Sequence, residues 1–486
     1  MRAGASASGS GKTCAATMAA GVSDGAERRK KWRCDVGLAS VFSCGGSSPV
    51  PVVLAAAPLA LTAWTLVVWI PKELRPVVLR SCVIAFVAYG ATSRLLPVIG
   101  KKIPRAKYGC DLLKRPAREA IADGDKTVPE SLGLVSGVCF VLALVVTQAF
   151  TDDYIDDHEY AAAMLSIVFA VLLGFADDIL DLEWKYKYVL PPLMSLPLLS
   201  AYGGGTTVVP PRVAREWLVD ASGSDGPVLS TLGAVVDGGL GLLFGGGVDP
   251  LGFGLVNLGR AYMAYMVLLA VFCTNAINIY AGVNGLEAGQ TYVVGLAILC
   301  MSAVELGRAS SSHHNSLDGA PVAAKNHLFA VTVMLPFVAT TLALLRANWF
   351  PARVFVGDTF TNYAGMTLAV VAILGHFPLM LMGLMVPQLL NFLVSVPQLF
   401  KLAPCPRHRL PTYDDATGYL RYSKVNDRAT TVPEADDRMN LTLINVALRA
   451  AGGLTEPALA AVLLAFQVAC CAAAVALRFA LVGRIY

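Results

Sequence analysis

Residues 258–287 read LGRAYMAYMVLLAVFCTNAINIYAGVNGLE, an apolar run that ends in amide side chains and glycines. About 20 consecutive apolar residues can cross the hydrocarbon core of a bilayer as one helix. Helices are the default in lipid, because the bilayer offers the backbone no hydrogen-bond partners. The stretch therefore predicts a membrane helix with a group of polar side chains at its carboxyl-terminal end.

The composition of the whole chain also indicates a membrane protein. Of the 486 residues, 56% are hydrophobic and 15% are charged, whereas a soluble domain carries roughly 25% charged residues. These values argue against a soluble enzyme, a disordered protein and a basic nucleic-acid-binding domain, so no nucleic-acid partner is expected. The 11 cysteines include no CxxC pair, and we interpret them as small buried residues rather than as a disulfide framework or a zinc site.

Apolar runs recur along most of the chain. They lie at 52–70, 77–98, 132–150, 161–176, 189–202, 258–281, 290–305, 327–345, 362–376, 379–400 and 455–483. This pattern predicts an all-α, polytopic integral membrane protein with about 10–11 transmembrane helices. Residues 1–50, rich in Gly, Ala and Ser, are expected to form a disordered N-terminal extension. Residues 51–71 predict an extra transmembrane helix ahead of the main membrane domain, residues 77–486.

The segments between the runs differ in charge from one side to the other. Lys and Arg are concentrated in one alternating set, namely 99–131, 177–188, 282–289, 346–361 and 401–454. The other set holds few, and residues 151–160 (TDDYIDDHEY) hold none. Basic loops stay on the cytoplasmic side of a membrane. The first set is therefore predicted to face the cytoplasm, and four clusters of polar residues fall within it, which indicates a single active site on that face.

The first cluster is GFADDILDLEWKYK, residues 174–187, directly after an apolar run. Asp177 and Asp181 are four residues apart, so a continuous helix would place them on one face, with Asp178 offset. Adjacent carboxylates repel each other and are best tolerated beside a cation. The alternative is a solvated helix end in which Asp181 pairs with Lys185.

The second cluster ends the run quoted above. Asn275, Asn278 and Asn284 are amides at the end of an apolar helix, where unpaired polar groups are costly. Asn also suits helix caps and turns, with Gly282 and Gly285 as helix breakers. Capping explains one of these residues but not three.

The third cluster is NWFPARVFVGDT, residues 348–359. Its carboxylate, Asp358, follows a glycine and precedes a new span, which suits a helix N-cap. The alternative is a ligand for Mg²⁺, because hard oxygen ligands gathered from separate loops suit that ion.

The fourth cluster is PCPRHRLP, residues 404–411, in which prolines hold the segment extended. Arg407 and Arg409 can grip phosphate oxygens with two parallel hydrogen bonds each. The triplet with His408 is equally compatible with a basic anchor at the membrane face. The four clusters together supply carboxylates and amides for Mg²⁺ and cations for phosphate, so they predict metal-assisted phosphoryl transfer at the membrane surface.

At these residues the chain resembles a known family. The blocks are FADDILDL (175–182), FCTNAINIYAGVNGLEAGQ (272–290), NWFPARVFVGDTF (348–360), PQLLNFLVSVPQLF (387–400) and PCPRHRLP (404–411). From about 77 to 485 the chain resembles the UDP-N-acetylglucosamine–dolichyl-phosphate N-acetylglucosaminephosphotransferases. These form the eukaryotic branch of the polyprenyl-phosphate N-acetylhexosamine-1-phosphate transferases, and the last block is typical of that branch.

The resemblance implies an activity and a location. The enzyme would transfer GlcNAc-1-phosphate from UDP-GlcNAc to dolichyl phosphate, giving dolichyl-diphospho-GlcNAc and UMP, the first step of the N-glycan lipid precursor pathway. It would depend on Mg²⁺ and lie in the endoplasmic reticulum membrane, with the active site facing the cytoplasm. Its partners would be both substrates and the lipid bilayer. The oligomeric state is left open, with a homodimer as one possibility.

The resemblance also implies roles for single residues. The proposed ligands of Mg²⁺ are Asn278 and Asp358. The proposed catalytic groups beside the metal and the phosphates are Asp177, Asp178, Asp181 and Lys187. The proposed contacts to the donor are Phe355 stacked on uracil, Asn284 and the backbone of Leu112 at the uracil edge, and Glu130, Arg407, His408 and Arg409 at the sugar and its phosphate.

Some features depart from the family pattern. Leu113 stands where a polar residue is usual, and extra residues lie between Lys114 and Pro129. A bacterial-type sugar-1-phosphate transferase is the alternative within the class. A membrane transporter is the alternative from another class. Transport predicts ionisable residues in the middle of spans, whereas here they gather at one face, which favours an enzyme.

Overall fold

The computed structural model describes residues 50–104, 107–110, 127–150, 157–182, 187, 189–220, 228–251, 254–311, 322–406, 409–414, 416–425 and 438–485. The N-terminal extension expected over residues 1–50 therefore lies almost wholly outside the described residues.

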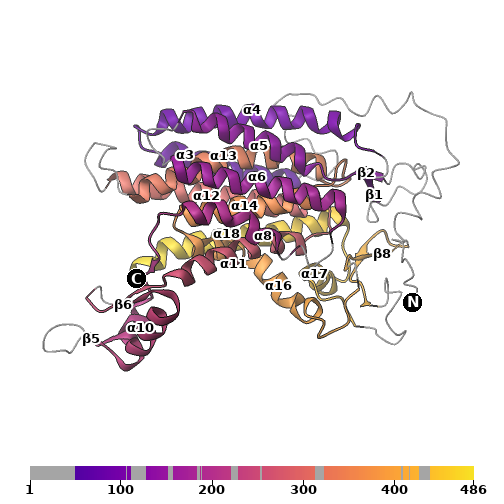
Figure 1. The fold of residues 1–486 in the computed structure, drawn as a ribbon. Helices are drawn as coiled ribbons and strands as arrows, with labels where there is room; N and C mark the ends of the chain where they lie inside the picture. The colour runs from indigo at the N-terminus through magenta and orange to yellow at the C-terminus, as the bar shows by residue number, and fades with distance from the viewer. Residues whose placement is uncertain are drawn as a thin grey trace, which may run out of the picture.

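Helices, most of them long, form the body of the molecule and run across the view in Figure 1. They are α3 Val50–Trp69, α4 Arg75–Gly100, α5 Gly133–Gln148, α6 Asp157–Leu180, α8 Leu190–Ala201, α11 Arg260–Ile279, α12 Leu286–Ser311, α13 Val322–Asn348, α14 Gly357–Leu374, α15 Pro378–Leu384, α16 Val386–Leu399 and α18 Glu456–Ile485. Each apolar run expected to span the membrane lies on one or two of these helices. The all-α, polytopic membrane architecture is thus confirmed.

The helices differ in how well they suit a complete crossing. In the described part of the chain six are long and apolar enough to cross a membrane: α4, α6, α11, α12, α13 and α18. Helices α3, α5, α8 and α14 carry four further expected spans; they have 12 to 20 residues and are not among the helices that are both long and apolar enough. The run at 379–400 is broken at Met385 into α15 and α16, which are bent by 74°. Pro387, in the first turn of α16, lacks an N–H and suits a new helix start there.

Short elements lie at the two ends of the helices, and the sequence analysis did not anticipate them. One end carries β1 Tyr108–Cys110, β2 Thr127–Pro129, β8 Thr412–Tyr413, β9 Leu420–Arg421 and α17 Leu443–Ala451 (Figure 1). The other carries β3 Thr207–Val208, α9 Arg212–Leu218, β4 Val219–Asp220, β5 Val228–Leu229, α10 Thr231–Phe244, β6 Gly247–Asp249 and β7 Leu255–Asn257. Strands β3, β7 and β6 form one antiparallel sheet in that order.

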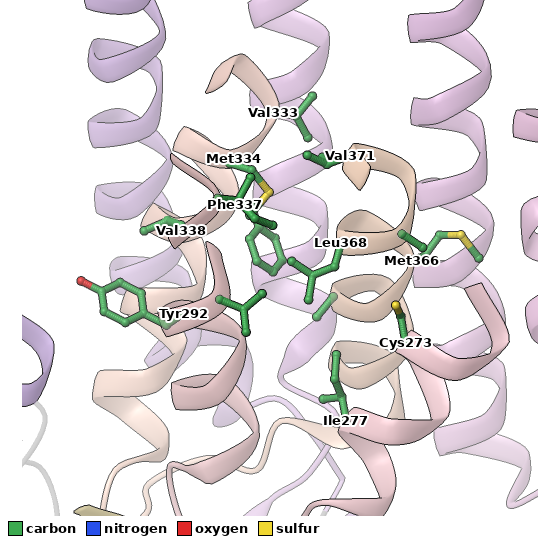
Figure 2. Close-up of a cluster of buried hydrophobic side chains, with 14 of the residues drawn as sticks. Cys273, Ile277, Tyr292, Val333, Met334, Phe337, Val338, Met366, Leu368 and Val371 are labelled. Carbon is green, nitrogen blue, oxygen red and sulfur yellow. The ribbon is translucent and has the colours of Figure 1, made fainter. Parts of the chain in front are cut away.

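Helix α14 occupies the centre of the bundle. All its residues from Thr359 to Leu374 are buried. Figure 2 shows apolar side chains gathered around it, including Ile277 of α11, Phe337 of α13 and Leu368 of α14 itself. The packing fixes α14 from several sides, so its first residues are held in place by the core.

Two glycines let the backbones of neighbouring helices approach α14 closely. A Cβ added to Gly174 of α6 would lie 2.8 Å from the Cα of Thr359. A Cβ added to Gly365 of α14 would lie 2.5 Å from the Cα of Thr274 on α11. Small residues at such crossings allow tight packing between membrane helices. The ends of α6, α11 and α14 are therefore held close together.

We expect Gly365→Ala to lower the free energy of unfolding by about 1–3 kcal/mol, because the new methyl group has no room against the α11 backbone. Gly90→Ala on α4 is the matched control, since an added Cβ there meets nothing within 4 Å. That change should stabilise slightly, because alanine is the better helix former. Thermal unfolding of both variants in one detergent measures the difference, and equal midpoints would contradict the close approach.

Candidate active site

Three helix ends meet at one end of the bundle. The last turn of α6 carries Asp177 and Asp178, the last turn of α11 carries Asn278, and the first turn of α14 carries Asp358. Lys187 lies just ahead of α8, which begins at Leu190. Residues from three of the sequence clusters are thus brought together.

The carboxylate of Asp178 caps helix α14. It accepts hydrogen bonds from the backbone N–H of Asp358 at 2.7 Å and of Thr359 at 3.0 Å, and from the Thr359 hydroxyl. The first N–H groups of a helix lack partners within the helix, and a negative charge is favoured at that end. The residue at the N-cap position, Val356, makes no side-chain cap. The capping role considered for Asp358 therefore belongs to Asp178, and the Asp358 carboxylate takes other partners.

Lys187 bridges the two remaining carboxylates. Its Nζ lies 2.8 Å from Oδ2 of Asp177 and 2.7 Å from Oδ2 of Asp358. Asn278 donates its Nδ2 to Oδ1 of Asp358 at 2.8 Å. Burial by itself would lower the pKa of Lys187, but the charge of Asp358 and the hydrogen bonds to both carboxylates outweigh it and raise the pKa above its ordinary value. Lys187 is therefore a permanent cation between two acidic groups.

A residue distant in the sequence caps the carboxyl-terminal end of α6. Lys107 donates from Nζ to the backbone carbonyl of Ile179 at 2.7 Å and to that of Asp178 at 3.4 Å. A cation is favoured at this end of a helix. The helix ends at Leu180, and Asp181 has a φ of 49°, in the left-handed region. The expectation that Asp177 and Asp181 share a helix face is therefore wrong, because Asp181 lies beyond the helix and is exposed.

Phe355 and Glu130 lie together beside β1. The backbone N–H of Phe355 donates to the carbonyl of Pro129 at 2.9 Å, and that of Leu132 donates to the carbonyl of Phe355 at 3.1 Å. A Cβ added to Gly109 would collide with Glu130 and lie 3.0 Å from the Phe355 ring. Part of Glu130 is exposed, yet burial of its carboxyl group and the charge of Asp178 raise its pKa.

A buried amide joins the second and third clusters. Asn348 accepts from the N–H of Gly285 at 3.0 Å and donates to the carbonyl of Val354 at 2.9 Å. This fixes the turn that holds Asn284, whose N–H donates to Glu456 at 2.9 Å. Asn275 behaves differently, because its amide donates to the carbonyl of Val271 within its own helix.

The fourth cluster is described only in part. Arg407 and His408 lie outside the described residues, as does Leu112. Arg409 donates from Nη1 to the carbonyl of Leu441 at 3.2 Å. Leu410 packs against Gly282, where an added Cβ would collide with it. The segment therefore runs beside the turn that follows Asn278.

The donor set at the meeting point suits Mg²⁺. Among the described residues no group of three His, Cys, Asp or Glu side chains is arranged to hold a metal. The available oxygens come instead from Asp177, Asp358 and Asn278, whose Nδ2 is directed at Asp358. Mg²⁺ is typically held by one or two carboxylates together with substrate phosphates, and these residues match that pattern. They do not match a structural zinc site, in which the protein supplies all four ligands.

Sequence reasoning assigned no role to two residues that shape this site. Lys107 was counted only among the basic loop residues, although it closes α6. Asn348 lies in the third cluster, and its position as a polar residue at the end of an apolar span could have indicated a structural role. The capping role of Asp178 left no local signal, because its partners are 180 and 181 residues away.

The sequence is similar to those of known proteins. Residues 160–376 match the family model described as Glycosyl transferase family 4, a range that includes Asp177, Asn278 and Asp358 and ends before Arg409. The curated relatives include UDP-N-acetylglucosamine–dolichyl-phosphate N-acetylglucosaminephosphotransferases of Dictyostelium discoideum, 39% identical over 85% of this chain and 92% of the relative, and of Schizosaccharomyces pombe, 34% identical over 70% and 72%.

A bacterial relative is more distant. The phospho-N-acetylmuramoyl-pentapeptide-transferase of Clostridium perfringens is 24% identical over 68% of this chain and 90% of the relative. The eukaryotic matches are both stronger and longer. The chain therefore belongs to the family of UDP-N-acetylglucosamine–dolichyl-phosphate N-acetylglucosaminephosphotransferases.

Proposed function

We propose that the protein transfers GlcNAc-1-phosphate from UDP-GlcNAc to dolichyl phosphate. A phosphate oxygen of dolichyl phosphate forms a bond to the β-phosphorus of the donor. The bond from that phosphorus to the oxygen of UMP breaks, and UMP leaves with the electron pair. The observation that carries this proposal is the set of Asp177, Lys187, Asn278 and Asp358 at one end of the bundle, together with the family of the chain.

The metal would be Mg²⁺, held by Asp358 and Asn278 with Asp177 close by. When bound, it supplies positive charge against the diphosphate of the donor and the charge that develops on the leaving phosphate. The carboxylates alone would repel an anionic donor. Two cations therefore fit the site, the ion and Lys187, whose ammonium already bridges Asp177 and Asp358.

The residues of the chain mainly position charge. A phosphate monoester has a second pKa of about 6, so at neutral pH the acceptor needs no strong base to become a nucleophile. Lys187 would contact a phosphate oxygen, and Asp177 holds its ammonium group in place. Phosphoryl transfer is catalysed mostly by positioning and by electrostatic stabilisation, which matches this arrangement.

The segments around the helix ends would bind the uracil and the sugar of the donor. Phe355 offers an aromatic face for uracil. The turn at Asn284 lies near Phe355, because Asn348 bonds both to Gly285 and to Val354. Glu130, beside Phe355, would face the sugar. Arg409 would hold the GlcNAc phosphate or the N-acetyl carbonyl, together with Arg407 and His408.

The location follows the charge of the loops. Basic segments surround the site, which supports a cytoplasmic orientation of this end of the bundle. The names of the eukaryotic relatives support the endoplasmic reticulum as the membrane. The donor is water-soluble and charged, and the acceptor phosphate lies at the membrane surface. A site at the ends of the helices is where both can meet.

We expect Asp358→Asn and Asn278→Ala to reduce turnover by at least about 10²-fold, because each removes a hard oxygen group from the metal and the diphosphate. The measurement is transfer of label from radiolabelled UDP-GlcNAc into organic-extractable lipid, at several Mg²⁺ concentrations. Asp414→Asn is the control, since this carboxylate pairs with Arg421 on the surface. Near-normal activity of either site variant at low Mg²⁺, with an unchanged thermal unfolding midpoint, would rule out the ligand assignment.

Arg409→Lys should lower turnover by about 10²-fold, near 2.7 kcal/mol, although it keeps the charge. A guanidinium holds two oxygens in a fixed fork, whereas an ammonium is a point charge on a flexible stem. Arg421→Lys is the matched control in the same loop, because Arg421 is 50% exposed and paired with Asp414. Equal and small losses in both variants would leave Arg409 as a membrane-face anchor only.

Cys405 tests the orientation of the site. It is exposed, unlike the other cysteines that the structure describes, and it lies two residues from Arg407. In sealed microsomes a membrane-impermeant maleimide should label it without detergent, and UDP-GlcNAc should slow the reaction. Cys405→Ser identifies the background from the remaining cysteines. Labelling that requires permeabilisation would place the site on the lumenal side.

A further inference from the structure

A small unit covers the end of α11 that lies away from Asn278. It comprises residues 203–257 as far as they are described, with α9, α10 and the three-stranded sheet. Its own core is small and centres on Leu218, Val248 and Val256. A helix of 20 residues such as α11 is about 30 Å long, so this unit and the active site are separated by roughly the thickness of the hydrocarbon core.

Helix α10 turns its charged residue inward and exposes several large apolar side chains. Asp237, its only charged residue, accepts a hydrogen bond from the N–H of Val248 on β6 at 2.8 Å. Val235, Leu242 and Leu243 are instead 69%, 87% and 66% exposed. Val236 and Leu240 of the same helix pack against the core of the unit, so α10 is apolar on its outer side as well as on its inner side. A helix with one face in water carries polar residues on that face instead.

The helix is well defined at both ends, so the exposure is not a frayed terminus. Ser230 accepts from the N–H of Gly233 at 3.0 Å at the amino end. Gly245 takes the left-handed conformation that ends a helix, with a φ of 67°. On the neighbouring α9, Val213 and Trp217 are exposed as well. Large apolar side chains exposed together in this way mark an interaction site.

The position of the unit indicates what covers this surface. In Figure 1 the long helices run across the view, and α10 lies beside their left-hand ends rather than beyond them. Strand β7 ends at Asn257, and the membrane-crossing α11 begins at Arg260. The unit is therefore held at the level of the ends of the spanning helices, where the membrane boundary is expected. Trp217 suits that boundary, where tryptophan is enriched.

We propose that α10 and the exposed side of α9 lie in the bilayer leaflet opposite the active site, with the outward side chains of α10 among the acyl chains. Helices of this kind bury one apolar face at the boundary between headgroups and acyl chains. α10 has no Lys or Arg, so its insertion rests on apolar burial rather than on attraction to anionic lipid. The unit then anchors the start of α11, whose other end carries Asn278.

The test uses the full-length protein in nanodiscs of a neutral phosphatidylcholine. A photoreactive benzoylphenylalanine replaces Leu242 in one variant and Val235 in a second. Phe86, 69% exposed on the spanning helix α4, is the position for a lipid-facing reference. Ala416, exposed beside the β8–β9 turn, is the position for a water-facing reference.

After illumination, mass spectrometry should find lipid adducts at positions 242 and 235 in a yield similar to that at position 86, and none at position 416. Crosslinks between two copies of the chain from position 242 would show that a second copy covers α10. Absence of lipid adducts at both 242 and 235, with adducts at 86, would show that the helix faces water. Either result overturns the proposal.

Discussion

The carboxylate of Asp178 joins the end of α6 to the beginning of α14, and the geometry of the candidate site depends on this contact. Three donors in the first turn of α14 point at it, two of them backbone N–H groups. Leaving a buried donor without a partner costs about 1–3 kcal/mol. The contact therefore fixes where α14 starts. Because Asp358 is the second residue of that helix, its distance from Asp177 and Asn278 is fixed as well.

This cap also determines which acidic groups remain for chemistry. Three carboxylates lie within two adjacent helix ends, and Asp178 is fully engaged by α14. Asp177 and Asp358 both contact the ammonium of Lys187. These two carboxylates and one ammonium together carry one net negative charge. A diphosphate donor and a phosphate acceptor bring several more negative charges. Further cations must enter with them, and the oxygen donors at this point suit Mg²⁺.

Much of this could be predicted from the sequence, because apolar runs and loop charges are strong signals in lipid. The meeting of the clusters at Asp177, Asn278 and Asp358 followed from counting alternate segments. Asp181 was misplaced because α6 ends at Leu180. Lys107, which contacts the last carbonyls of this helix, is 71 and 72 residues away from its acceptors and gave no local signal. The break at Met385 was missed because the apolar run continues across Pro387, which marks the new helix start. The strands of the unit at 203–257 were missed because each has only two or three residues. The capping role of Asp178 was missed because its partners are 180 and 181 residues away.

The two tasks of the site rest on different kinds of structure. The groups proposed to handle phosphate lie on or beside helix ends that the buried core fixes, with glycines at the crossings. The groups proposed to read the base and the sugar come from connecting segments, which are tied to those helices by single contacts such as Asn348 and the packing of Leu410 on Gly282. A change in a connecting segment can therefore alter which donor fits without moving Asp177 or Asp358. Phosphoryl transfer tolerates little displacement of the reacting groups, so it is the chemistry that needs the rigid part of the molecule.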